Sequence, residues 1–291
     1  MLAEIIEQLF EFAAKSIPSD QILEAKKTYQ KETGEIYEDD KSYNSRMALF
    51  LEWYLFDQSA LDKSKTILES IIDENADGWN NDRLKIYKDI TENIHGLFLA
   101  KKIKDGNVKV LNLFTDEKYL VAEKDSRLIF RKNDVFQGRI VFFQDQYHFT
   151  GNFCFHPDKT QKYINSEVKK VALIQKSYKK ELAGLEKNLF KANKNLKNNE
   201  KQIENLNRKI ENTAAENKIQ HLSQKLSILF EERATLTKCI QNLEGEIFIV
   251  KNDKIKLEGR QQTNALINKL AYMNLKWERS RQIEISDIYK N

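Results

Sequence analysis

The sequence predicts an α+β protein. We expect an N-terminal helical layer with a small antiparallel SH3-like β-barrel, followed by a long antiparallel coiled-coil hairpin. Three observations lead to this expectation. Apolar residues recur at helical spacing up to residue 95, alternate at strand spacing over 96–160, and follow a seven-residue repeat over much of 161–291. These ranges are the predicted domains, the last one ending in a C-terminal amphipathic helix.

The composition of the 291-residue chain excludes several classes of protein. With 32% charged residues, nine glycines and two prolines, it is neither collagen-like, nor proline-rich, nor fully disordered. We find no apolar run long enough for a membrane span. Acidic residues at 4, 7 and 11 occupy the place of a signal peptide's basic leader, so we expect a cytoplasmic protein. In that compartment Cys154 and Cys239 are not expected to form a disulfide.

Five helices are expected in the helical layer. They cover Leu2–Ala13, Gln21–Lys31, Ser45–Phe56, a segment capped by Ser59–Asp62, and Asn81–Ile94. The run from Ala48 to Phe56 is almost continuously apolar, which predicts a helix that is buried all round. A carboxylate in such a run must be paired or lie at its edge, so we expect Glu52 to cap or brace the helical layer.

Short segments rich in β-branched and aromatic residues predict the strands. They are Leu97–Ile103, Val108–Phe114, Lys118–Ala122, Arg127–Arg131, Val135–Phe143 and Tyr147–Phe155. Asp105-Gly106 between the first two is a strong signal for a two-residue hairpin. Five or six consecutive short strands favour a small, partly closed barrel that ends at Pro157.

Two heptad runs of similar length follow, Val168–Asn212 and Ala215–Gly259. A continuous helix would need a two-residue slip between them, which is not one of the usual coiled-coil discontinuities. We therefore favour an antiparallel hairpin, with a long dimerising helix as the alternative. The polar interruptions of the two runs are Gln175, Asn199, Arg233 and Lys254.

The end of the second run carries a conflicting local signal. Taken alone, Glu246–Leu257 resembles a β-hairpin around Asn252-Asp253, but the heptad seam passes through it, so we expect a helix. A final amphipathic helix over 262–281 would present Leu266, Leu270, Met273 and Trp277 to a partner surface.

Charge is distributed unevenly along the chain. Residues 161–291 contain 26 basic and 16 acidic side chains, a balance of +10, and residues 1–160 contain 22 and 28, a balance of −6. In the first heptad run five cations recur every seven residues at the position farthest from the seam: Lys180, Lys187, Lys194, Lys201 and Arg208. We call these five residues the basic stripe. They form either a solvated outer face or a contact surface with cations about 10 Å apart.

Catalytic and metal-binding patterns are weak. Cys154 and His156 share one face of a predicted strand, but no second pair follows at a zinc-ligand spacing. The adjacent carboxylates Asp39-Asp40 are expected to be charge at a helix start, and Glu231-Glu232 are expected to lie on the coiled-coil surface. We find no phosphate-binding loop, nucleophile elbow or HExxH motif, so we predict no catalytic residue, metal or cofactor.

One block of sequence resembles a known group of proteins. Ala48-Leu-Phe-Leu-Glu-Trp-Tyr-Leu-Phe-Asp57 precedes Leu97-Phe98 and Val108-x-Val-Leu-Asn-Leu-Phe-Thr-Asp-Glu-Lys-Tyr-Leu-Val121. This pattern is similar to uncharacterised bacterial proteins that combine a Glu-Trp-x-Leu-x-Asp element in a helical layer with a small β-domain. The resemblance covers residues 45–156 and implies the architecture and a bacterial origin. It implies no activity.

Together these features favour a non-enzymatic interaction or scaffold protein. In this hypothesis an acidic head presents a basic rod to an acidic protein surface or to a second copy, using the basic stripe and the C-terminal helix. The alternative is a nucleic-acid-associated protein whose basic stripe contacts phosphates. A third class, an enzyme with its site on the barrel, would require perturbed acids in a pocket.

Overall fold

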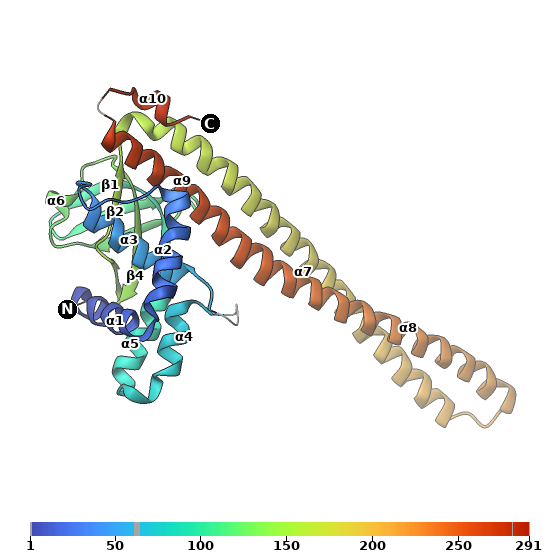
Figure 1. Ribbon diagram of the computed structural model, residues 1–291. Coiled ribbons are helices and arrows are strands. Elements are labelled where there is room, and N and C mark those ends of the chain that lie inside the picture. The colour runs from blue at the N-terminus through green and yellow to red at the C-terminus, as the bar shows by residue number, and fades with distance from the viewer. Residues whose placement is uncertain (1, 61–64, 281, 291) are drawn as a thin grey trace. The chain divides into compact units, whose positions relative to one another are not determined.

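The computed structural model describes residues 2–60, 65–280 and 282–290, and it confirms a mixed α+β protein (Figure 1). The chain divides into two compact units. The first contains residues 1–172 and 262–291, and the second contains residues 173–261. The helical layer and the sheet therefore share one unit, which also takes in the last helix.

All five helices expected in the helical layer are present. They are α1 (Leu2–Ser16), α2 (Ser19–Thr33), α3 (Tyr43–Asp57), α4 (Ile67–Glu74) and α5 (Asn81–Thr91), with the short 3₁₀ turn η1 (Ala76–Gly78) between the last two. The expected cap of the fourth helix includes Leu61 and Asp62, which lie outside the described residues. Instead, the Thr66 hydroxyl accepts a hydrogen bond from the Glu69 N–H at 3.2 Å, and the Glu69 carboxylate accepts one from the Thr66 N–H at 2.6 Å.

These helices share a core with one end of the sheet. Trp53 and Phe56 of α3 are buried, as expected for its apolar run, and they pack with Val141 and Phe143 of the sheet. Ring contacts add directional packing, for example between Tyr29 and Trp53, whose centroids are 5.0 Å apart. The helical layer is thus fixed to the strand that carries Val141.

The sheet contains six strands. They are β1 (Asn93–Lys104), β2 (Asn107–Asn112), β3 (Lys118–Ala122), β4 (Val135–Phe143), β5 (Gln146–Phe149) and β6 (Cys154–His156). Their order is β1-β2-β3-β5-β4-β6, with a further pairing between β1 and β4. The predicted Asp105-Gly106 hairpin is confirmed, because Lys104 pairs with Asn107 and Gly106 has a φ of 74°.

The sheet differs from the prediction in three ways. It is mixed rather than antiparallel, because β3 and β5 pair in parallel, and an SH3-like barrel is not established. The strand expected at Arg127–Arg131 is wrong: the short helix α6 (Ser126–Ile129) lies there, with Leu128 87% exposed and Phe130 buried. The single strand expected at Tyr147–Phe155 is split into β5 and β6, with Gly151 at a φ of 103° between them.

A second core of the first unit forms around the C-terminal helices. After the 3₁₀ turn η2 (Asp158–Thr160), the first turns of α7 (Gln161–Glu211) pack with α9 (Gly259–Arg279) and with α10 (Ile285–Ile288). Ile164, Ile267 and Leu270 are fully buried there, against Leu97 and Val135 of the sheet. This packing explains why the last helix belongs to the first unit.

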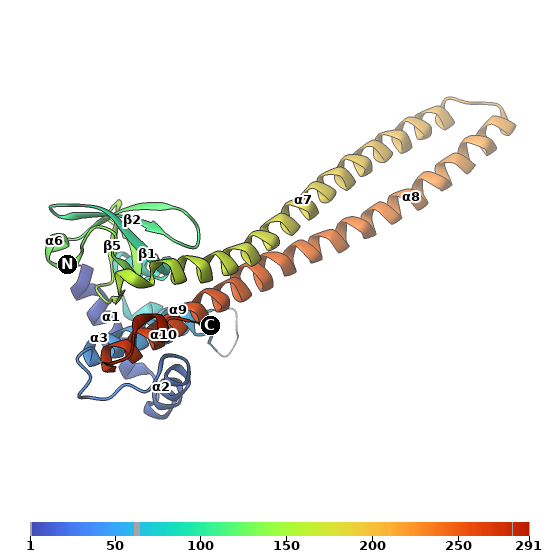
Figure 2. The same ribbon diagram turned by 90° about the horizontal axis from the view of Figure 1, so that it is seen from above.

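The second unit consists mainly of α7 and α8 (Glu216–Ile249), which run antiparallel and side by side in both views (Figures 1 and 2). The chain reverses at residues 212–215, so the long continuous helix is not observed. Contacts recur along the pair in antiparallel register, from the Gln175 amide on the Gly259 carbonyl at 3.0 Å to the Asn199 amide on the Leu229 carbonyl at 3.1 Å.

The segment with the conflicting local signal is helical, as predicted, but in a wider form. Residues Val250–Glu258 form the π-helix η3, which joins α8 to α9 without a break. The helix expected at 262–281 is therefore the end of a longer helical stretch, and Arg281 lies outside the described residues. In the part of the chain that the structure describes, we find no helix with the length and apolar character of a membrane span.

Candidate functional site

The basic stripe lies on the outer side of α7, and all five of its residues are exposed. Arg208 pairs with Glu204 one turn earlier, at 2.5 Å. For the four lysines, the contacts of the described residues include no carboxylate within 4 Å. These lysines therefore keep their charge available to solvent or to a partner.

The acidic residues of α7 are used differently. Glu181 pairs with Lys254 at 2.9 Å, Glu186 with Lys251 at 2.9 Å, and Glu200 with Arg233 at 3.7 Å, all across the helix pair. We call residues 216–258, which run antiparallel to α7, the return arm. The return arm thus binds three of the carboxylates that might otherwise neutralise the stripe. Residues 173–211 contain ten basic and five acidic side chains, whereas residues 212–261 contain eight and seven. The positive excess of the second unit is concentrated on α7.

The two compact units differ less in net charge than residues 1–160 and 161–291 do. The second unit contains 18 basic and 12 acidic residues, a balance of +6, which leaves 30 and 32, or −2, for the first. The difference from +10 and −6 arises because residues 161–172 and 262–291 belong to the first unit. The outer face of α7 is therefore the more distinctive charged feature.

A polar layer interrupts the helix pair near its middle. Asn199 is 5% exposed, and its amide nitrogen donates to the Leu229 carbonyl and to Glu232, while its Oδ1 has no hydrogen-bond partner among the described residues. It lines an open groove of about 620 Å³ with Gln202, Glu231 and other polar side chains. The polar interruption on the other arm, Arg233, lies at the same level. Two polar seam positions that the sequence places 34 residues apart thus share one layer.

The C-terminal residues expected to contact a partner lie in the first unit. Leu270 is fully buried and Met273 is 8% exposed, and both pack against the sheet and the start of α7. Trp277 is 37% exposed. The apolar face of α9 is thus already covered by the same chain, and these three residues belong to a different unit from the basic stripe.

An ionic cluster lies between the helical layer and the sheet. Arg139 of β4 is 1% exposed, and both of its terminal nitrogens contact the Asp57 carboxylate, at 2.6 and 3.3 Å. Its Nε lies 3.5 Å from Glu52, which also accepts a hydrogen bond from the Asn152 amide at 2.8 Å. The expectation that Glu52 is paired and braces the helical layer is confirmed, with Arg139 as the partner.

His95 completes this cluster. Its Nδ1 lies 3.4 Å from the Asp57 carboxylate and 3.1 Å from the Asn264 side-chain oxygen. Burial raises the pKa of Asp57, but the charges and hydrogen bonds of Arg139 and His95 outweigh burial and hold this pKa well below its usual value. The carboxylate therefore stays ionised and binds two cationic or donor groups. This arrangement orients helix against strand, and its members face one another rather than solvent.

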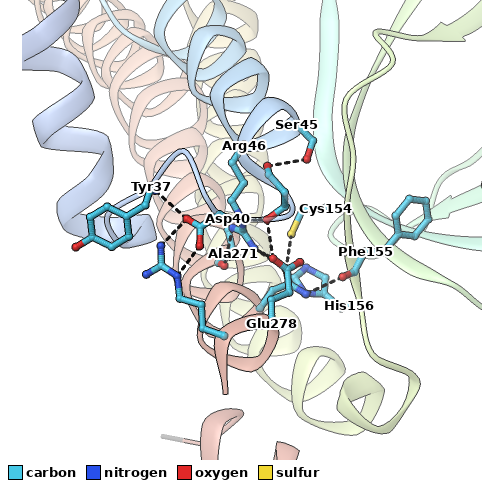
Figure 3. A network of polar contacts seen from close by, with 12 residues as sticks. Tyr37, Asp40, Ser45, Arg46, Cys154, Phe155, His156, Ala271 and Glu278 are labelled. Atoms are coloured by element: carbon cyan, nitrogen blue, oxygen red, sulfur yellow. Dashed lines mark hydrogen bonds and ion pairs between the residues drawn. The ribbon is translucent and has the colours of Figure 1, made fainter. Parts of the chain in front are cut away.

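A second polar network fastens α9 to α3 and β6 (Figure 3). Arg46 is 5% exposed and donates to the Asn274 side chain at 2.7 Å and to the Ala271 carbonyl at 3.2 Å. The same guanidinium lies 3.2 Å from Glu278. The Asn274 amide in turn donates to the Phe155 carbonyl at 2.9 Å. One arginine thus connects three segments that are distant in sequence.

Cys154 and His156 point into this network from β6, and their shared strand face is buried. The Cys154 thiol lies 3.5 Å from Asn274, and His156 Nδ1 lies 3.2 Å from the Tyr289 hydroxyl. Burial raises the pKa of Cys154 to about 11, and burial, followed by the charge of Arg46, lowers the pKa of His156 to about 3. The thiol and the imidazole are therefore neutral at physiological pH, which suits packing better than nucleophilic or base chemistry.

Sequence reasoning missed the two arginines that organise these networks. A usable signal existed for Arg139, because it interrupts the apolar strand Val135–Phe143, just as Glu52 interrupts the apolar helix. Opposite charges in two apolar elements suggest a mutual pair. Arg46 carries no comparable signal, since it precedes the apolar run of α3 and its partners lie in the last helix.

We compared the chain with known proteins. No curated protein and no solved structure matches it. A model described as a family of unknown function (DUF7986) matches residues 3–199, which include the helical layer, the sheet and much of α7. This match agrees with the resemblance of residues 45–156 to uncharacterised proteins and extends it in both directions. The chain belongs to this family of unknown function, DUF7986.

Proposed function

We propose that this protein is a non-enzymatic interaction protein, whose α7 outer face binds an acidic protein surface. The observation that carries the proposal is the separation of charge on α7. Three of its glutamates pair with the return arm, whereas four lysines of the stripe point outward at intervals of about 10 Å. A straight row of unneutralised cations favours a partner with an extended negative face.

The architecture supports this role in two ways. We propose that α7 and α8 pack as a coiled coil, because the seam residues between Leu182 and Leu206 are buried or half-buried. We further propose that the sheet is a small SH3-like barrel, because the β1–β4 pairing and a core of sheet residues such as Phe98 and Phe136 support closure. In this arrangement both units are scaffolds, and the buried ionic groups stabilise the first of them.

A cytoplasmic location remains part of the proposal. Cys154 and Cys239 are both free, which is the usual state of thiols in a reducing compartment.

The proposal is tested by charge reversal. Lys187, Lys194 and Lys201 are replaced by glutamate, and binding of a fluorescent polyglutamate peptide is measured by anisotropy at low salt. We expect wild-type protein to bind and the triple variant to lose binding, with helicity by circular dichroism unchanged. The matched control reverses three exposed lysines of the return arm, Lys218, Lys225 and Lys238, and should keep most of the binding.

The same experiment separates the nucleic-acid alternative. Duplex DNA replaces the peptide, and salt is titrated. Retention of DNA with a steep loss as salt rises, together with no binding of polyglutamate, would favour phosphate contacts, because counterion release produces that salt dependence. Equal binding by the stripe variant and the return-arm variant would remove the stripe as a site for either ligand.

A further inference from the structure

One face of α8 carries two exposed phenylalanines. Phe230 is 45% exposed and Phe248 is 67% exposed, although both belong to a regular helix. Their separation of 18 residues equals five turns, so the two rings lie on the same face of α8, about 27 Å apart. Exposed phenylalanines of this kind are enriched in protein interfaces.

The stretch of this face between the two phenylalanines has little charge. Arg233 and Glu244 lie along one edge and Lys238 lies along the other, and the residues between these edges are small or neutral: Ala234, Thr237, Gln241 and Gly245. Short side chains allow a second helix to approach closely. The α7 stripe, in contrast, would repel a copy of itself. The two arms therefore favour different partners.

A groove lies beside Phe248. It has a volume of about 480 Å³, and its apolar lining includes Leu182 of α7, Ile247 of α8 and Ile255 of η3. The groove is open to solvent, and the exposed Phe248 is one of its lining residues. Its size and lining suit an aromatic side chain from outside the unit.

We propose that this face of α8 binds the same face of a second copy, in antiparallel orientation about a two-fold axis midway between the two phenylalanines. Such an axis places Phe230 of each copy in the groove beside Phe248 of the other. In a two-fold symmetric interface each residue meets the same partner in both copies. Phe230 and Phe248 can do this because they are a whole number of turns apart and therefore lie on the same face. The interface does not depend on the α7 stripe.

Charge complementarity supports a second copy of the chain as the binding partner. The same two-fold axis brings Glu244 of each copy opposite Ala234 of the other, next to Arg233. The Arg233 side chain is 48% exposed and reaches Glu200 only at 3.7 Å, so it can also meet an incoming carboxylate. Glu244 is exposed, and its contacts within the described residues include no ion pair. Two symmetry-related Glu244–Arg233 pairs would flank the axis.

Light scattering on the full chain over a range of micromolar concentrations tests the proposal. We expect a concentration-dependent dimer. Phe230→Lys and Phe248→Glu should each weaken dimerisation at least about tenfold. The matched control is Ile228→Lys, which changes a 56%-exposed residue on the other side of α8 and should leave the dimer intact.

Mixing the two variants tests the orientation. In an antiparallel dimer, the lysine introduced in one variant meets the glutamate introduced in the other, and the phenylalanine that each variant retains still packs against its counterpart. The mixture should therefore dimerise where each variant alone does not. A parallel dimer gives no such rescue. A wild-type monomer at all concentrations, a dimer unaffected by both variants, or no rescue on mixing would each overturn the proposal.

Discussion

Two buried arginines organise the first unit. Arg139 binds two carboxylates from α3, and Arg46 binds a side chain and a carbonyl of α9. A buried charge is costly unless its partners surround it, so each arginine depends on the correct placement of several segments. These residues therefore specify how the elements of the unit fit together, in addition to any net stabilisation that they provide.

Replacing Arg139 tests the ionic cluster. Arg139→Met leaves Glu52 and Asp57 buried without their cation, so we expect a loss of about 3–5 kcal/mol in the free energy of unfolding. Tryptophan fluorescence during urea denaturation measures this loss, because all three tryptophans belong to the first unit. The control Arg127→Met removes an exposed arginine that pairs with Asp105, and should change stability by no more than about 0.5 kcal/mol. Similar effects of the two substitutions would contradict the assigned role of Arg139.

His156 makes stability depend on pH. Its pKa is lowered to about 3 in the folded chain, so between about pH 6.5 and pH 3 the unfolded state binds more protons than the folded state. Stability from this residue is complete above about pH 6.5 and declines as pH falls, by at most about 1.4 kcal/mol per pH unit.

The measurement is denaturant unfolding across this pH window. His156→Gln should flatten the slope, whereas His148→Gln should leave it in place because His156 remains. An unchanged slope in the His156 variant would show that other groups cause the acid sensitivity.

At the scale of elements, local patterns predicted helices better than sheet topology. The phase change between two heptad runs indicated the antiparallel arms, and the apolar run of α3 indicated a buried helix. Parallel pairing of β3 with β5 was not predictable in this way, because it depends on α6 replacing an expected strand in the connection between β3 and β4. Residues 127–131 have strand-like composition. In the folded chain, however, Leu128 is exposed and takes no part in a sheet core, so a short helix is compatible with these residues.

The polar layer of the helix pair is the element whose energetics can be tested most directly. Asn199→Leu removes a buried side chain whose oxygen has no partner among the described residues, so we expect a gain of about 1–3 kcal/mol in the stability of the second unit. We also expect the register of α7 against α8 to become less uniquely defined, because a polar residue in the seam disfavours shifted pairings of the two helices.

Thermal unfolding followed by circular dichroism measures this gain. Leu196→Asn, which adds a second polar residue to the same seam, is the opposite control and should lower the midpoint. A lower midpoint for Asn199→Leu would mean that the hydrogen bonds to Leu229 and Glu232 outweigh the unpartnered oxygen.

At the scale of the whole molecule, the chain leaves the first unit at residue 172 and returns to it at 262. No local sequence pattern predicts this, since the amphipathic face of α9 fits an external partner as well as an internal one. Contacts such as Arg46 with Asn274 join residues 228 positions apart and exist only after the chain has returned. The sequence therefore predicts the apolar face of α9, but it does not predict that residues of the same chain cover this face.

Deleting the second unit tests this organisation. Replacing residues 173–261 with a short Gly/Ser linker should leave a first unit that unfolds cooperatively, because its internal contacts are retained. Ending the chain after residue 261 removes Leu266, Ile267 and Leu270 from the core and should prevent stable folding. Limited proteolysis and thermal unfolding compare the two. A cooperative fold in the truncated chain would contradict the assignment of α9 to the first unit.

The two thiols differ in a way that has a practical consequence. Cys154 is buried, whereas Cys239 is exposed and lies nine residues from both Phe230 and Phe248. Nine residues correspond to two and a half turns, so Cys239 lies on the opposite side of α8 from the two rings. A maleimide-linked dye or a solid support attached there would leave the phenylalanine face open to solution. The unaltered chain thus has one selective anchoring point for single-molecule or surface-based binding measurements.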